Sequence, residues 1–232
     1  YDHVAKRLNG RGFSVRGYDQ YGHGKSSGRR GALPSDQRLL EDLEYVIDAT
    51  RKRMPENKPL ILFGHSMGGV VSARMVSMGI KVQGLVLSSP ALDPGLTFIQ
   101  KTLLALLLAI APDFCVANRL NPEKISHNPQ TVQAYRQDPL VHDRISARLT
   151  QFIVREGAAV RMHAKDWRIA TLLLYAGDDK LVNPSGSSQF AQAAPTDVVQ
   201  SYCYSSMYHE IFNELEQEAV FNQLKTWLDS KF

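Results

Sequence analysis

A serine stands at the centre of Gly64-His65-Ser66-Met67-Gly68-Gly69, which follows the apolar run 59–63 and precedes a run with helical periodicity. A serine hydroxyl is a nucleophile only when it is exposed, next to a base, and close to donors for a developing oxyanion. A glycine-rich turn between a strand and a helix meets these needs. An incidental serine in such a turn would not explain the flanking strand and helix. The pattern predicts Ser66 as a nucleophile and the Met67 N–H as an oxyanion donor.

A serine of this kind requires an acid and then a histidine later in the chain. The segment Gly177-Asp178-Asp179-Lys180 follows a predicted strand, at the sheet edge where ligand sites gather. Two adjacent carboxylates project in different directions, so only one of them can reach a histidine. We predict Asp179 as the acid, with Asp178 and Asp93 as the alternatives.

The histidine expected to act as the base is His209, in the segment Tyr208-His209-Glu210-Ile211-Phe212-Asn213-Glu214. This segment lies between the last predicted strand and the last predicted helix, where a loop residue can reach Ser66 across the sheet. His65 adjoins the nucleophile but is expected to point elsewhere, and His23 is interpreted as part of a structural turn. Surface or capping roles are expected for the remaining histidines, His3, His127, His142 and His163.

The elements that must position these residues are visible in the apolar pattern. Near-continuous apolar runs predict strands covered on both faces, and helical periodicity appears between them. Ser35 is the expected N-cap of the first such helix. The alternation predicts an α/β fold with a mostly parallel sheet. The predicted strands are 13–18, 60–63, 82–87, 170–175 and, more weakly, 198–204. The helical stripes are Leu39, Leu43, Val46 and Ile47, then Val70, Val71, Met75 and Met78, then Val220, Leu224, Trp227 and Leu228.

The regular alternation stops between Pro90 and Trp167, a stretch too long for an ordinary loop. We therefore predict a helical cap at 91–167, inserted between two parts of the core at 1–90 and 168–232. The segment Leu103–Ala111 within it is apolar around its whole circumference. Such a helix either packs on the core or contacts lipid, and it is too short to cross a bilayer.

The composition is that of one folded domain, with 44% apolar and 22% charged residues among 232. The formal charge of +4 and the short basic runs Arg29-Arg30 and Arg51-Lys52-Arg53 argue against a nucleic-acid partner. Cys115 and Cys203 lie far apart without metal-ligand spacing and are expected to be free thiols. The predicted chemistry requires neither a metal nor an organic cofactor.

The chain resembles the monoacylglycerol lipase and lysophospholipase branch of the α/β-hydrolases along essentially its whole length. The resemblance implies the catalytic triad Ser66, Asp179 and His209, and an acyl chain that enters under the cap. The segment Asp138–His142, in the cap, favours this branch over hydrolases in general. The matching segments are Tyr18–Ser26, Gly64–Gly69, Asp138–His142, Leu174–Val182 and Tyr208–Glu214.

The resemblance implies a serine hydrolase that cleaves esters of single-chain lipids, monoacylglycerol or lysophospholipid, through an acyl-enzyme. The expected partners are the lipid ester itself and, transiently, a membrane or micelle surface at the cap. The expected location is cytoplasmic, with a membrane-peripheral location as the alternative. Two other functions stay open: a carboxylesterase or thioesterase for short soluble esters, and a binding protein without catalysis.

One feature of the branch has no match in this sequence. Its members carry a His-Gly turn after an earlier strand, and a backbone N–H of that turn is the second oxyanion donor. We expect the sequence to be N-terminally incomplete, with this donor and about 40 further residues upstream. A strand would then be missing between 13–18 and 60–63, leaving unpaired backbone groups that each cost about 1–3 kcal/mol when buried. Residues 1–232 are therefore expected to be inactive alone.

Overall fold

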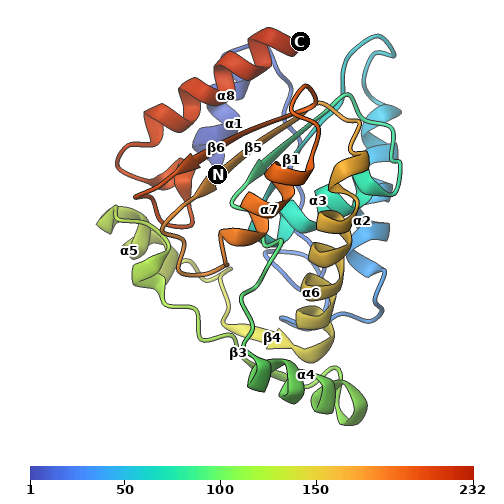
Figure 1. Cartoon of the computed structure of the whole chain (residues 1–232), viewed down its shortest axis with the longest axis vertical. Helices are drawn as coiled ribbons and strands as arrows, with labels where there is room; N and C mark the ends of the chain where they lie inside the picture. Colours follow the sequence, from blue (N-terminus) through green and yellow to red (C-terminus); the bar gives the residue numbers. More distant parts are fainter.

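The computed structural model describes residues 1–232 and contains a four-stranded parallel sheet between two layers of helices (Figure 1). This arrangement confirms the predicted α/β fold. Each strand corresponds to an apolar run recognised in the sequence. In sheet order the strands are β1 (Ile61–His65), β2 (Gly84–Ser88), β5 (Thr171–Ala176) and β6 (Val199–Tyr204).

Alternate strand residues enter two separate cores, as the two-residue period of a strand requires. Leu85, Leu87 and Leu173 are buried on one face of the sheet, whereas Leu172 and Leu174 are buried on the other. The first face is covered by α2 (Arg38–Arg51), α3 (Ser66–Ser77), α6 (Ala147–Met162) and α7 (Ser185–Ala193). The second is covered by α1 (Asp2–Asn9), the 3-10 turn η3 (Ile211–Asn213) and α8 (Gln217–Lys231).

The prediction that Ser35 is the N-cap of α2 is wrong, because the N-cap is Gln37, two residues later. The helix begins at Arg38 after Gln37, without a side-chain cap, and Ser35 lies in the preceding turn. The reason is tertiary, because the carboxylate of Asp36 accepts hydrogen bonds from Arg148 and Arg155 of α6. These bonds hold the loop in a turn that places Ser35 outside capping range.

The predicted strand at 13–18 is also wrong. This segment forms no ladder with any strand, and Arg16 instead donates to Thr50 on α2. A groove of about 1170 Å³ lies between it and β1, which is the edge strand of the sheet. Paired strands lie about 5 Å apart, so the groove leaves the segment without a partner.

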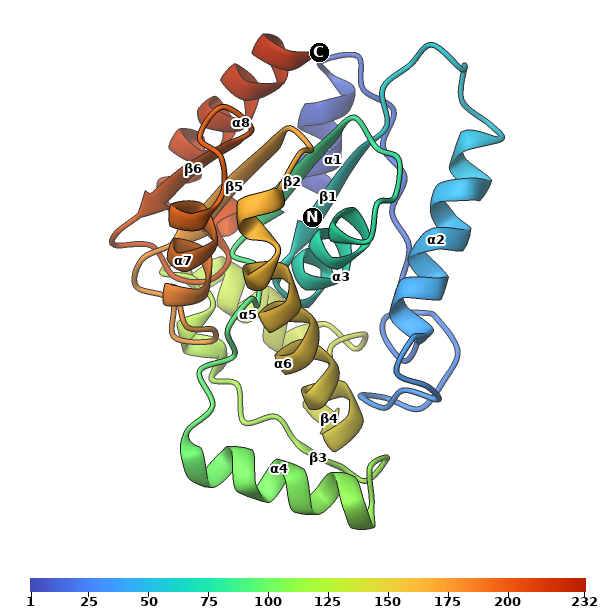
Figure 2. The same cartoon turned by 45° about the vertical axis from the view of Figure 1, so that its right-hand side comes forward.

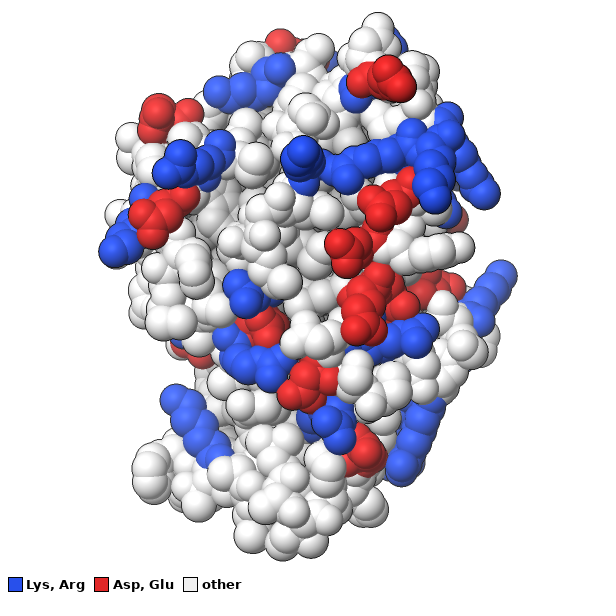
Figure 3. Space-filling model, turned by 90° about the vertical axis from the view of Figure 1, so that its right-hand side faces the viewer, with Lys and Arg blue, Asp and Glu red and all other residues white.

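Between β2 and β5, in the stretch predicted as a cap, the chain forms three α-helices and a small two-stranded antiparallel sheet. Helix α4 (Phe98–Ile110) lies at the far end of the molecule from the C-terminus (Figure 2), and this end carries few charges (Figure 3). The last helix of the stretch, α6, packs against α3 in the helical layer. The other elements are β3 (Cys115–Ala117), η1 (Pro122–Lys124), α5 (Pro129–Gln137), β4 (Arg144–Ser146) and η2 (Ala164–Asp166).

None of the helices combines the length and the apolar character that a bilayer-spanning segment needs. The apolar helix α4 begins with a capping box, in which Thr97 and Gln100 satisfy each other's backbone N–H groups. Only Leu104 of this helix is buried. The packing of α4 on the rest of the molecule is therefore confined to one narrow stripe.

Candidate active site

Ser66 lies at the sharp turn where β1 ends and α3 begins. Its φ angle is 51°, in the left-handed region that costs a non-glycine residue about 1–3 kcal/mol. The turn is tight enough that a Cβ on Gly64 would lie 2.5 Å from the Gly68 carbonyl oxygen. A Cβ on Gly69 would lie 2.7 Å from Pro90 Cβ, whereas Gly68 faces open space. Two of the three glycines are therefore required by close packing, which holds Ser66 in its strained conformation.

Met67 is the second residue of α3. N–H groups in the first turn of a helix have no acceptor within the helix, and the helix dipole makes them good donors to an anion. The role of the Met67 N–H as an oxyanion donor stays a prediction that this place in the helix favours.

Asp179 and His209 are brought together from the loops after β5 and β6. His209 Nδ1 lies 2.6 Å from Asp179 Oδ2, and both side chains are almost completely buried. The other oxygen of Asp179 accepts from the N–H groups of Leu181 and Val182, at 2.9 and 3.1 Å. A carboxylate on Nδ1 holds the proton there and leaves Nε2 free to accept one. The pair therefore has the geometry of an oriented base.

The two alternative acids are engaged elsewhere. Asp178 is half-exposed and forms an ion pair with Lys180. Asp93 accepts from Gly95 N–H and from the Asn183 amide, at 2.9 and 3.0 Å. Neither carboxylate contacts a histidine.

The ring of His65 lies against the ring of His209, with 4.8 Å between their centroids. The expectation that His65 points away from the site is therefore wrong. Its Nδ1 is 3.0 Å from the Ser88 carbonyl oxygen. This contact fixes the ring of His65, the residue directly before the nucleophile candidate. Burial, and secondarily the nearby His209, hold the pKa of His65 well below its usual 6.5. A neutral His65 does not compete with His209 for a proton.

The side chain of Ser66 forms no hydrogen bond. Its neighbour in the sequence, His65, packs on the ring of His209. The contact between the Ser66 hydroxyl and His209 Nε2 remains a prediction. Catalytic hydrogen bonds often shorten only when substrate binds.

The other histidines hold loops together. His23 Nδ1 is 2.9 Å from the Tyr21 carbonyl, in the turn that was expected for it. His142 of the cap reaches the Gly22 carbonyl at 3.1 Å and lies against the His23 ring. His127 contacts Glu214, a buried acid that sequence reasoning did not single out. His3 and His163 contact the carbonyls of Phe212 and Ala159.

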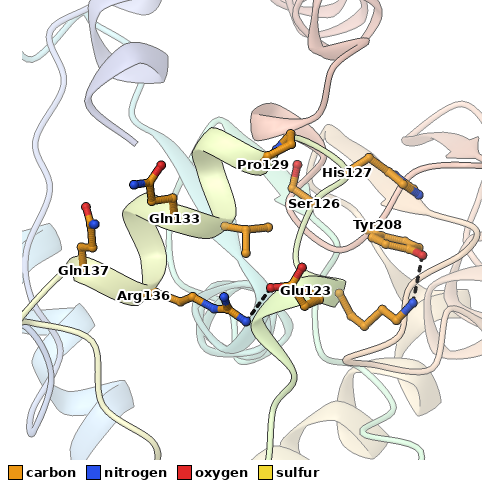
Figure 4. Close-up of a pocket in the computed structure, with 10 residues that line it drawn as sticks. Glu123, Ser126, His127, Pro129, Gln133, Arg136, Gln137 and Tyr208 are labelled. Carbon is orange, nitrogen blue, oxygen red and sulfur yellow. Dashed lines mark hydrogen bonds and ion pairs between the residues drawn. The ribbon is translucent and has the colours of Figure 1, made fainter.

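A second cavity, of about 710 Å³, lies between η1, α5 and Tyr208 (Figure 4). Most of its lining is polar, and neither Ser66 nor Asp179 contributes to it. No set of three His, Cys, Asp or Glu side chains is placed to hold a metal ion. Cys115 and Cys203 both carry free thiols, as predicted.

Comparison with known proteins agrees with this geometry. Residues 1–216 match the family described as serine aminopeptidase, S33. The monoacylglycerol lipase of Mycolicibacterium smegmatis is 30% identical over 99% of this chain and 83% of its own length. The chain is also 28% identical to an uncharacterised abhydrolase domain-containing protein of Dictyostelium discoideum, and it spans only 25% of that protein's length.

Among solved structures, the monoacylglycerol lipase of Paleococcus ferrophilus superimposes with a TM-score of 0.90 at 32% identity. The match covers 100% of this chain and 89% of that one. These likenesses confirm the resemblance seen in the sequence. The chain therefore belongs to the serine aminopeptidase S33 family, whose members are serine hydrolases with the α/β-hydrolase fold.

Proposed function

We propose that this protein hydrolyses the ester of a single-chain lipid, monoacylglycerol or lysophospholipid, through an acyl-enzyme on Ser66. The observation that carries the proposal is the buried hydrogen bond between Asp179 and His209, beside a serine held in a strained turn. A histidine oriented by a buried carboxylate and a strained backbone are both features that cluster at active sites. The similarity to two monoacylglycerol lipases supports the choice of substrate class.

The proposed reaction uses these residues in the following order. Ser66 Oγ attacks the ester carbonyl while His209 Nε2 takes its proton, and the Met67 N–H stabilises the oxyanion. His209 then returns the proton to the leaving alcohol, and the acyl group stays on Ser66. Water attacks this acyl-enzyme with His209 again as base, which releases the fatty acid. Asp179 keeps the imidazole in the required tautomer throughout.

The cap supports a lipid substrate and contact with a membrane or micelle surface. Helix α4 has a single charged residue, Lys101, and Leu103 and Leu106 are each more than half exposed. A contiguous apolar surface of this kind is costly in water and favourable at a lipid interface. We propose that the protein binds such a surface at least transiently. The exposed apolar side chains of the cap include Phe98, Ile99, Leu103, Leu106, Ile110, Phe114 and Val116.

Active-site labelling and a substrate series, both on the full-length protein, test the proposal together. We expect a fluorophosphonate to label Ser66, and monoacylglycerols to be hydrolysed with a higher kcat/KM than acetyl esters. Ser66→Ala and His209→Ala should each lower kcat about 10⁴–10⁶-fold, because triad members act as a unit. A preference for short soluble esters would indicate a carboxylesterase or thioesterase. Absence of labelling would indicate a protein that only binds its ligand.

A further inference from the structure

Glu214 is a completely buried carboxylate that takes no part in the reaction above. Neither a lysine nor an arginine contacts it. Burying a carboxylate costs several kcal/mol unless donors surround it. Here the donors are the Tyr208 N–H at 2.7 Å, the His127 N–H at 3.0 Å and His127 Nδ1 at 2.9 Å. The acid thus joins two segments that are about 80 residues apart in sequence.

One of these segments carries His209 and the other belongs to the cap. Next to the Glu214 contacts, the Glu210 N–H donates to the Ile125 carbonyl at 2.8 Å. Ser126 Oγ donates to the Asn213 carbonyl at 2.9 Å. The N–H groups on both sides of His209 are therefore held, one by Glu214 and one by the cap backbone.

Tyr208, directly before His209, is fixed by its side chain as well (Figure 4). Its ring stacks on the His127 ring with 3.7 Å between centroids, and Lys124 Nζ lies 3.2 Å from its hydroxyl. Both residues come from the cap: Lys124 is the last residue of η1, and His127 lies between η1 and α5. The loop that carries the base therefore rests on the cap at two positions, 208 and 210, on either side of His209.

His209 has one polar side-chain contact of its own, with Asp179. That bond fixes the Nδ1 side of the imidazole, but the direction of Nε2 also depends on where the backbone of residues 208–210 lies. A misplacement of about 1 Å in a catalytic group can cost about 10²-fold in rate. The support of this short loop is thus part of the catalytic geometry.

We propose that Glu214 is a positioning residue for His209, and that through His127 it links the placement of the cap to the direction of the base. This inference rests on the role proposed for His209. Glu214 acts only through the loop, because it contacts neither His209 nor Asp179. Displacement of the cap segment 125–127 would release the Glu210 N–H and would remove the two His127 donors that hold Glu214 next to the Tyr208 N–H.

The variant Glu214→Gln tests the proposal with little change in volume. Whichever way the amide lies, its NH₂ group faces at least one backbone N–H donor, that of Tyr208 or that of His127, so at least one of the three bonds is lost. We expect kcat to fall about 10–100-fold with KM nearly unchanged, after the active sites have been counted with a fluorophosphonate. Glu216→Gln, an exposed acid two residues later, is the matched control and should keep wild-type kcat.

His127→Gln provides a second variant that keeps its backbone N–H and removes only the ring. It should lower kcat in the same direction, and the double variant with Glu214→Gln should show less than the product of the two losses. If Glu214→Gln does not fold, His127→Gln decides the question alone. Wild-type kcat in His127→Gln would then overturn the proposal.

The low-field proton resonance of the Asp179–His209 hydrogen bond gives a readout without turnover. We expect Glu214→Gln to shift or broaden it, and Glu216→Gln to leave it unchanged. A lower melting temperature with unchanged kcat per titrated site and an unchanged resonance would show that Glu214 only stabilises the fold. A sensitive resonance in a chain that hydrolyses no ester would support the positioning role and contradict the proposed function instead.

Discussion

At the scale of single residues, the two aspartates after β5 differ in what surrounds them. Asp179 is buried and bonded to His209, whereas Asp178 pairs with Lys180 at the surface. Asp179→Asn should lower kcat/KM about 10⁴-fold, because an amide on Nδ1 favours the wrong tautomer of His209. Asp178→Asn should leave kcat/KM within a few-fold of wild type. The reverse order of the two losses would assign the acid to Asp178.

The histidine base also predicts a pH dependence. His209 must be neutral to accept the proton of Ser66, so kcat/KM should rise from acidic to neutral pH and then level off. A series of rate measurements on one soluble ester across this range checks the expectation. A flat profile would be incompatible with a histidine as the base.

His65 predicts a pH dependence of stability rather than of rate. Because its pKa is lowered in the folded protein, the unfolded chain binds more protons below about pH 6.5. The contribution of His65 to the free energy of unfolding is therefore complete above pH 6.5 and is lost as the pH falls below it. His65→Asn, whose amide can still donate to the Ser88 carbonyl, should lose less in melting temperature between pH 7 and pH 5. An equal loss in both proteins would refute this assignment.

At the scale of elements, α4 packs on the rest of the molecule through only one buried side chain, that of Leu104. Leu106 is 56% exposed, so Leu106→Asp should fold with a melting temperature close to wild type. We expect it to impair hydrolysis of long-chain esters in vesicles or micelles several-fold more than hydrolysis of an acetyl ester, because the charge disfavours interfacial contact. Equal losses for both substrates would point to damage elsewhere in the enzyme. No loss for either would show that α4 does not face the lipid.

At the scale of the whole molecule, the groove between residues 13–18 and β1 is the feature expected to lower the stability of the fold. The outer edge of β1 has no partner strand, and the groove of about 1170 Å³ interrupts the packing between α1, α2 and the sheet. A domain has only about 5–15 kcal/mol of net stability to lose. We expect the 232-residue chain to unfold over a broad temperature range and to bind an apolar dye when folded. A sharp calorimetric transition without dye binding would show that the groove is closed in solution.

The turn around Ser66 and the strands of the sheet could be predicted because short segments of the sequence specify them. The turn around Ser66 needs glycines at Gly64 and Gly69, and the strands at β1, β2, β5 and β6 are continuous apolar runs. Both signals depend on neighbours along the chain, so periodicity and residue type reveal them. The position of Asp179 after β5 followed from the same logic, since parallel strands present their carboxyl ends at one edge.

From the sequence alone the fold class could be predicted correctly, and the candidate nucleophile, acid and base could be proposed in their order along the chain. Tertiary structure alone decided that residues 13–18 stay unpaired, because a strand exists only when a partner lies about 5 Å away. It also decided that His65 packs on His209 and that Glu214 binds His127, contacts that join segments far apart in the chain. No local pattern encodes such contacts, because the buried environment that makes them favourable forms only when the sheet, the cap and the loop after β6 come together.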